Sequence, residues 1–229
     1  MKICIINPNS SIDMTRVIEE NARKYADGEF EIECIANSGA PEFIGSYEDM
    51  LEAEVKMIKI VKEKQDEYDA FIIACHSDPG LDVLKEISKK PIVGICEASL
   101  KLATMLGHSF SVISTGERPI PNKEALCRKY GVTSYLASVV GPREFKTDWH
   151  NIDSFIETGR RAVVEDKAEV LVLGCAGMGH ITKQMEEKLG VPVLDGVVCA
   201  LIVATGLVKA GLSTSKVRRY CRREGGVFL

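Results

Sequence analysis

The sequence predicts an α/β protein made of two pseudo-twofold-related half-domains, each a mostly parallel sheet of about four strands flanked by helices. Short apolar runs alternate with segments of helical periodicity along the chain, as in parallel sheets with crossover helices. Two of these runs, Phe71–Cys75 and Leu171–Cys175, lie one hundred residues apart, and each ends in a cysteine before a glycine-containing turn. Each is followed by a helix-like segment and by an apolar run that opens with proline, Pro91–Ile95 and Pro192–Leu194.

In the first half, the pattern predicts a first helix after Ser10 or Ser11, both of which are good N-caps. A third helix is expected to begin at Asp78-Pro79-Gly80, with Asp78 as N-cap and proline at the first helical position. The predicted strands lie near Lys2–Ile6, Phe30–Ala36, Ala70–Cys75 and Pro91–Ile95. A second helix is also predicted. Its apolar residues are expected to face a core, and they are Met50, Leu51, Val55, Ile58 and Val61.

The second half repeats this order. Its predicted strands are Ser109–Ser114, Thr133–Val140, Glu169–Cys175 and Pro192–Leu194. Its predicted helices are Pro119–Tyr130, Ile152–Lys167 and a buried helix within Gly196–Leu212. A helix from Glu97 to Gly107 provides a join, which predicts half-domains at residues 1–97 and 98–204.

The composition limits the classes of partner. The 229 residues are 45% hydrophobic, which is enough for a sizeable core, and the net charge of −4 gives no basic field for nucleic acid or membrane. Met1–Ile6 leads directly into Asn-Pro-Asn-Ser and is typical of a first strand rather than a signal peptide. No apolar run reaches the roughly 18 residues of a membrane span. We therefore expect a cytoplasmic protein that binds neither nucleic acid nor membranes.

The eight cysteines do not form a disulfide or metal framework. No C-x-x-C pair is present, and the chain is too long for a disulfide-rich scaffold. Cys4, Cys34 and Cys199 have apolar sequence neighbours and are interpreted as small core residues. With no H-E-x-x-H motif and four scattered histidines, no metal site is predicted.

A ligand site is expected where the strands end, because ligands of open parallel sheets bind outside the carboxyl ends of the strands. Small and polar residues follow four predicted strands, in the segments Asn7–Ser11, Cys75–Asp78, Ser114–Gly116 and Cys175–Met178. Gly174–Gly179 lacks the spacing of a nucleotide-binding fingerprint, so nucleotide binding is not predicted. Its glycines instead suggest backbone N–H groups that approach a substrate oxygen. The segment Gly39–Gly45 is interpreted either as a lid or as an exposed connecting loop.

Cys75 and Cys175 are the candidate catalytic residues. A thiol at a strand end before a helix N-terminus is expected to have a lowered pKa, which suits acid/base chemistry near neutral pH. If the halves face each other, the thiols flank one cleft and form the opposed acid/base pair of a racemase. One such cysteine is as well explained as a core residue, whereas two at matched positions favour catalysis. His76 and His180 are interpreted as surface or supporting residues, and a direct His76–Cys75 dyad is not expected because adjacent extended residues point apart.

Four motifs resemble the hydantoin/allantoin racemase branch of the aspartate/glutamate racemase superfamily. They are Ile6-Asn-Pro-Asn-Ser10, Cys75-x-x-Asp-Pro-Gly-Leu81, Val93-Gly-Ile-x-Glu-Ala98 and Gly174-Cys-Ala-Gly-Met178. The resemblance implies a cofactor-independent two-base mechanism with Cys75 and Cys175 as the catalytic pair. It also implies that residues 205–229 pack back on the first half-domain and that the protein is a homo-oligomer.

The sequence therefore predicts a cofactor-independent racemase of 5-substituted hydantoins or allantoin. The substrate-binding residues are expected to be Asn7, Asn9, Ser10, Gly45, His76, Thr115, Gly116, Ala176, Gly177 and Met178. The alternatives are an aspartate or glutamate racemase, or a related cysteine-dependent isomerase or decarboxylase. From other classes, a non-catalytic ligand sensor is suggested only by the basic segment Lys216–Arg223, and a thiol redox protein would need a reversible Cys75–Cys175 disulfide.

Overall fold

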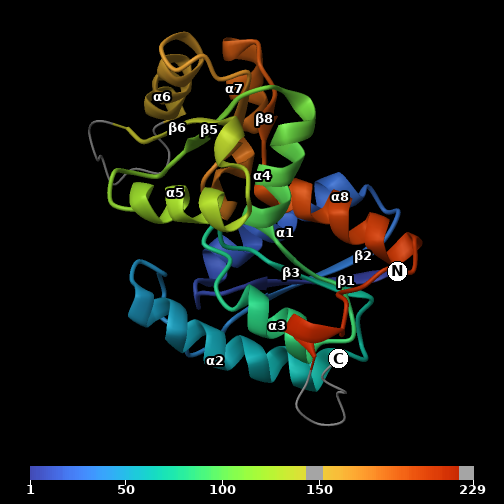
Figure 1. The fold of residues 1–229 in the computed structure, drawn as a ribbon. Coiled ribbons are helices and arrows are strands. Elements are labelled where there is room, and N and C mark those ends of the chain that lie inside the picture. Colours follow the sequence, from blue (N-terminus) through green and yellow to red (C-terminus); the bar gives the residue numbers. More distant parts are fainter. Residues whose placement is uncertain (143–151, 222–229) are drawn as a thin grey trace. The chain divides into compact units, whose positions relative to one another are not determined.

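The computed structural model describes residues 1–142 and 152–221, which belong to two α/β units (Figure 1). The first unit comprises Met1–Ile95 together with Ala200–Leu229, and the second comprises Cys96–Cys199. Each unit contains one four-stranded parallel sheet with helices around it, so the predicted fold class is confirmed. The chain crosses between the units within two helices, α4 (Ile95–Leu106) and α8 (Gly196–Lys209).

The sheet of the first unit has the strand order β2-β1-β3-β4. Its strands are β1 (Lys2–Asn7), β2 (Glu31–Ala36), β3 (Ala70–Ile73) and β4 (Ile92–Gly94). Every residue of β3 and β4 is buried, which is why these strands are continuous apolar runs rather than alternating ones. The carboxyl ends of the central strands are therefore held by a sheet that is covered on both faces.

The helices of the first unit are α1 (Ile12–Ala26), α2 (Tyr47–Lys64) and α3 (Leu81–Ile87). Ser11 caps α1 by accepting a hydrogen bond from the N–H of Met14 at 3.3 Å, as one of the two predicted N-caps. The expected Asp78 cap is wrong, because α3 begins at Leu81 after Gly80, whose φ of 67° suits glycine. The carboxyl group of Asp78 instead packs against Gly94.

The prediction for the buried face of α2 is also partly wrong. Val61 is buried as expected, but its buried companions are Ala53 and Met57. Leu51 is 63% exposed and Val55 is 62% exposed, and with Tyr47 at 77% they form an outward row that we call the α2 stripe. The helix therefore carries two apolar rows, and the row with smaller residues faces the unit's core.

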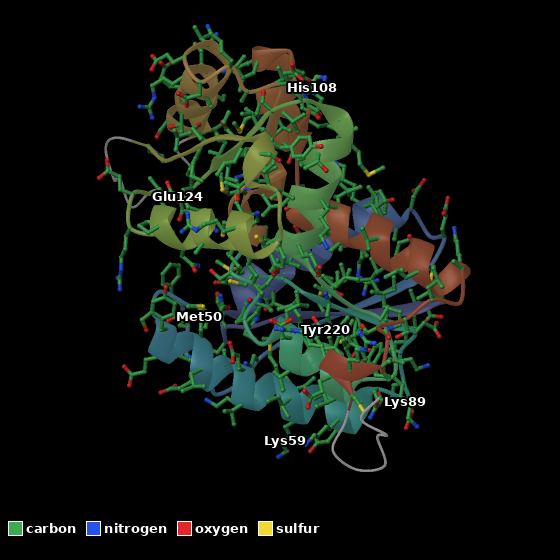
Figure 2. The ribbon with its side chains drawn as sticks, viewed as in Figure 1. Met50, Lys59, Lys89, His108, Glu124 and Tyr220 are labelled. Carbon is green, nitrogen blue, oxygen red and sulfur yellow. The ribbon has the colours of Figure 1, made fainter. Side chains whose placement is uncertain are left out.

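The segment after α8 packs against α3 within the first unit. Ser213 Oγ donates to the carbonyl oxygen of Lys89 at 2.9 Å. Tyr220, which is labelled in Figure 2, donates from its OH to Asp82 Oδ1 at 2.8 Å. Lys216 Nζ donates to the carbonyl oxygen of Glu86 at 3.1 Å. Part of the basic segment is thus used in packing, in a stretch that includes the short 3₁₀ helix η3 (Arg218–Tyr220). Its last residues, Arg222 and Arg223, lie outside the described residues.

The sheet of the second unit has the strand order β6-β5-β7-β8. Its strands are β5 (Phe110–Ile113), β6 (Leu136–Val140), β7 (Val170–Leu173) and β8 (Val193–Leu194). Its helices are α5 (Ile120–Lys129), α6 (Ile152–Val164) and α7 (Thr182–Leu189), with the 3₁₀ helices η1 (Thr133–Tyr135) and η2 (Ala176–Ile181). The strand predicted from Thr133 therefore starts three residues late, because η1 occupies its expected beginning.

The backbone hydrogen bonds of the two units repeat. The N–H of Ala74 donates to Ile6 O at 2.9 Å, and the N–H of Gly174 donates to Ile113 O at the same distance. Phe71 N–H reaches Pro91 O at 2.9 Å as Leu171 N–H reaches Pro192 O at 2.9 Å. The turn after each cysteine repeats too, because Asp78 N–H donates to Cys75 O and Met178 N–H donates to Cys175 O. These bonds make Cys75 and Cys175 equivalent positions of a repeated fold.

No disulfide joins any of the eight cysteines, all of which lie within the described residues. Cys4 and Cys199 are buried, as predicted, whereas Cys34 is only partly buried. Within residues 1–142 and 152–221, no helix combines the length and apolar character needed to span a bilayer.

Candidate active site

Cys75 and Cys175 lie just past the carboxyl ends of β3 and β7, each one residue after the last backbone bond of its strand. As residues, both are only partly buried, in contrast to the fully buried Cys4 and Cys127. These two cysteines therefore hold a fixed position at the edge where parallel sheets bind ligands.

The expectation of a lowered thiol pKa is wrong for Cys175. Burial raises the pKa of this thiol above its usual value, and the negative charge of Asp195 acts in the same direction. The backbone N–H of Gly177 and the ammonium group of Lys123 lower the pKa but do not cancel the effect of burial. Cys175 is followed by the 3₁₀ helix η2 rather than by an α-helix, so the expected α-helix N-terminus is not at this position.

A buried lysine supports the strand end that carries Cys175. Lys123, on α5, is 4% exposed, and its Nζ donates a hydrogen bond to the carbonyl oxygen of Gly174 at 2.7 Å. Gly174 itself has no room for a side chain, because a Cβ there would lie 2.7 Å from the carbonyl oxygen of Ile113. The residue before the thiol is therefore held from two sides, by β5 and by an ammonium group.

The loop after β5 is held close to the end of β6. Ser114 Oγ donates to the carbonyl oxygen of Gly116 at 2.7 Å, and both residues are buried. A Cβ on Gly141 would lie 2.8 Å from the carbonyl carbon of Gly116, so the two glycine backbones touch. Thr115, which lies between Ser114 and Gly116 in sequence, is partly exposed.

In the loop after β1, the two asparagines hold the chain rather than face outward. Asn7 Nδ2 donates to Asn9 Oδ1 at 2.7 Å and to Thr15 Oγ1 at 2.9 Å. Asn9 Oδ1 also accepts from the N–H of Ser11 at 3.0 Å. Both asparagines are buried, whereas Ser10 is partly exposed. The asparagine side chains thus fix the shape of the loop that presents Ser10.

The chain is similar over nearly its whole length to known racemases. Residues 3–204 match the family described as Asp/Glu/Hydantoin racemase. The chain is 38% identical to a hydantoin racemase of Pseudomonas sp. (strain NS671), over 96% of this chain and 91% of the relative. It is 37% identical to the hydantoin racemase of Paenarthrobacter aurescens, over 96% of each chain. The crystal structure of allantoin racemase from Pseudomonas fluorescens superposes with a TM-score of 0.92 at 31% identity, covering 100% of both chains.

The chain belongs to the Asp/Glu/hydantoin racemase family. It is accordingly an isomerase of a cofactor-independent family and acts on a small molecule. The resemblance drawn from the four sequence motifs is confirmed.

The remaining predicted site residues of the racemase lie in different environments. His76, Ala176 and Met178 are buried, and Gly177 is partly exposed. Gly45 donates its N–H to Asp49 Oδ2 at 2.9 Å and so belongs to the start of α2. His180 is exposed, with its Nδ1 at 3.0 Å from the carbonyl oxygen of Gly177.

Sequence reasoning missed three buried polar residues of the racemase. Asn37 follows β2, and its Nδ2 donates to Pro8 O at 2.9 Å, which ties the loop after β1 to the loop after β2. Asp195 follows β8. Both could have been found by extending the strand-end rule to every predicted strand. Lys123 lies inside a helix, and nothing in its sequence surroundings marks it.

No group of three or more metal-ligating side chains was found in the part of the racemase that the structure describes.

Replacing Lys123 by methionine will move the pH profile of the racemase to higher pH. The ammonium group stabilises the Cys175 thiolate, so its loss raises the pKa of that thiol further and reduces the fraction able to accept a proton. Loss of the bond to the Gly174 carbonyl will also lower the free energy of unfolding by about 1–3 kcal/mol. The rate against pH and a urea titration measure the two effects.

The matched control for Lys123 is Lys183→Met, which removes an exposed lysine of α7. This variant is expected to keep the profile of the unmodified protein. An unchanged profile in Lys123→Met would mean that Lys123 supports only the fold.

Proposed function

We propose that the protein racemises 5-substituted hydantoins or allantoin, using Cys75 and Cys175 as its two acid/base groups. The observation that carries this proposal is the equivalence of the two thiols, each one residue past the last backbone bond of a matched strand in the repeated fold. The full-length similarity to hydantoin racemases and to the allantoin racemase structure supports the choice of substrate.

In the proposed reaction, one cysteine as thiolate removes the proton from the stereogenic carbon. The carbon–hydrogen bond breaks, a sulfur–hydrogen bond forms, and the electron pair moves onto the neighbouring carbonyl as an enolate. The other cysteine, as thiol, then gives its proton to the opposite face of the carbon and becomes the thiolate. The atoms and charges balance without a redox partner, and the two thiols exchange roles for the other enantiomer.

The raised pKa of Cys175 supports one starting state for this cycle. At neutral pH a thiol with a raised pKa keeps its proton, so Cys175 starts as the proton donor. Its thiolate then forms only as the proton leaves for the substrate. Lys123 and the Gly177 N–H, which both favour the thiolate, stabilise the charge at that moment.

A hydantoin-type ring fits the uncharged groups at the strand ends. The hydrogen at its stereogenic carbon lies between a carbonyl and a ring nitrogen, which makes it more acidic than that of an amino-acid carboxylate. Ser10 and Thr115 have partly exposed hydroxyl-bearing side chains, and Gly177 is partly exposed. We propose that these residues, with Asn7, Asn9, Gly45, His76, Gly116, Ala176 and Met178 around them, form the substrate site.

We also propose that the protein is a cytoplasmic homo-oligomer. Eight cysteines without a disulfide suit a reducing compartment. The α2 stripe supports self-association, because three large exposed apolar side chains in one helical row favour contact with another protein surface.

The test is proton NMR in D₂O with both enantiomers of a hydantoin panel and allantoin. We expect the stereocentre proton signal to disappear while optical rotation falls to zero. Turnover of aspartate or glutamate instead would identify an amino-acid racemase. A product of lower mass would identify a decarboxylase, and tight binding without exchange would identify a sensor.

A further inference from the structure

The two units differ at one pair of equivalent positions beside the thiol-bearing strands. In the first unit, Ile73 of β3 is level with Gly94 of β4. In the second, Leu171 and Val172 of β7 are level with Val193 and Leu194 of β8. One further step along these parallel strands brings Leu173 level with Asp195. Because β3 and β7 are equivalent, Gly94 and Asp195 hold the same place in the repeat.

The empty side-chain position at Gly94 is filled by another residue of the same unit. A Cβ on Gly94 would lie 2.4 Å from both Cγ and Oδ1 of Asp78. Asp78 is 3% exposed and stands three residues after Cys75, where the second unit has the buried Met178. Thus the first unit brings a carboxyl group to this place from the loop after its cysteine, and the second brings one from the residue that follows the neighbouring strand β8.

The carboxyl group of the second unit is buried, and its charge acts on the thiol of the same unit. Asp195 is 6% exposed, and its Oδ1 accepts a hydrogen bond from the N–H of Val197 at 2.8 Å. Its charge disfavours the Cys175 thiolate, against the opposite effects of Lys123 from α5 and of the Gly177 N–H from η2. His180, on η2, is exposed and has its Nδ1 3.0 Å from the Gly177 carbonyl.

We propose that Asp78 and Asp195 are equivalent positioning residues, each placing a buried carboxyl group beside the thiol-bearing strand of its own unit and holding the proton on that unit's cysteine. This inference rests on the proposed two-thiol mechanism and explains how the two thiols are matched. A racemase alternates between two states that differ in which thiol carries the proton. If the pKa values of the two thiols differed by about one unit, one of these states would be favoured about tenfold over the other.

Peptide-resolved alkylation tests the pairing without substrate. Each protein is treated with iodoacetamide from pH 6 upward, over the pH range in which circular dichroism shows that it stays folded, and mass spectrometry gives the pH midpoint of reaction at each cysteine. Asp195→Asn removes the charge but keeps an oxygen for the Val197 N–H. We expect its Cys175 midpoint to fall by about one pH unit, with Cys75 unchanged, and Asp78→Asn to lower the Cys75 midpoint.

Glu186→Gln is the matched control. Glu186 Oε1 also accepts a hydrogen bond from β8, from the N–H of Val193 at 3.2 Å. This variant removes one negative charge and is expected to leave both midpoints in place. If the midpoints fell equally in this control, the overall charge of the protein, rather than the pairing of each carboxyl group with its thiol, would determine the pH midpoints of the two cysteines.

A relocation variant tests the equivalence itself. Asp195→Gly should lower the Cys175 midpoint, and adding Met178→Asp should restore it, because the second unit then copies the first. The proposal is overturned if Asp195→Asn and Asp78→Asn both leave the midpoint of their own cysteine unchanged, or if the folded relocation variant keeps the lowered midpoint. Shifted midpoints in a protein that turns over no hydantoin would uphold the pairing and reject the proposed substrate.

Discussion

Alanine at either Cys75 or Cys175 will lower the rate of racemisation by roughly 10³-fold, within the range of positioned acid/base groups. Each thiol is expected to serve one face of the stereogenic carbon, so inversion needs both. Hydrogen exchange needs only the thiolate on the face that carries the proton. Each single variant should therefore exchange the proton of one enantiomer with D₂O slowly while optical rotation persists.

Cys34→Ala is the control for these two variants. Cys34 is also partly exposed, but it lies within β2, level with Ile5 of β1, and away from the carboxyl end of its strand. Its replacement is expected to leave the racemisation rate within a factor of two. Racemisation at the unmodified rate in Cys75→Ala or Cys175→Ala would show that the two-thiol mechanism is incorrect.

Raising the pH from 9 to 10 will lower the free energy of unfolding by about 3 kcal/mol through three deeply buried thiols. Burial raises the pKa of Cys127 to about 11 and that of Cys199 to about 12, and it raises the pKa of Cys4 as well. In the folded protein these three thiols stay protonated over this interval, whereas in the unfolded chain they ionise. The folded state then binds more protons than the unfolded one. Because an unfolded thiol is only about half ionised at pH 9, stability falls by about 1 kcal/mol per thiol between pH 9 and pH 10.

Urea titrations at pH 8, 9 and 10 under reducing conditions measure this loss. A loss of this size is a large part of the usual 5–15 kcal/mol of a folded protein. Cys127→Ala removes one of these thiols, so stability should fall less steeply with pH in this variant than in the unmodified protein. A free energy of unfolding that stays constant from pH 8 to pH 10 would contradict the prediction.

The strands, and the position of Cys75 and Cys175 just after two of them, were predictable because their signals are local. A continuous apolar run marks a strand buried on both faces, and the residue after it lies at the ligand-binding edge. Ser11 was predictable as a cap for the same reason. These features depend on neighbours in sequence, which a single chain displays directly.

The missed features depend on contacts between distant residues. Asp78 leaves the cap of α3 because Gly94, sixteen residues later, gives its carboxyl group a place to pack. The pKa of Cys175 depends on its burial and on Lys123 and Asp195, which lie on other elements. On α2, periodicity marks two apolar rows, and only the packing of the unit decides that Met57 is buried and Leu51 exposed.

The segment that packs on α3 has a consequence for the order in which the protein matures during synthesis. The second unit is one continuous stretch, Cys96–Cys199, whereas the first is completed by residues from Ala200 onward. Ser213 and Tyr220, which bond Lys89 and Asp82, leave the ribosome more than one hundred residues after their partners. Domains usually finish folding in the order of their synthesis. Here we expect the second unit to complete its folding first. The first unit completes its folding only after the last residues of the chain have been synthesised.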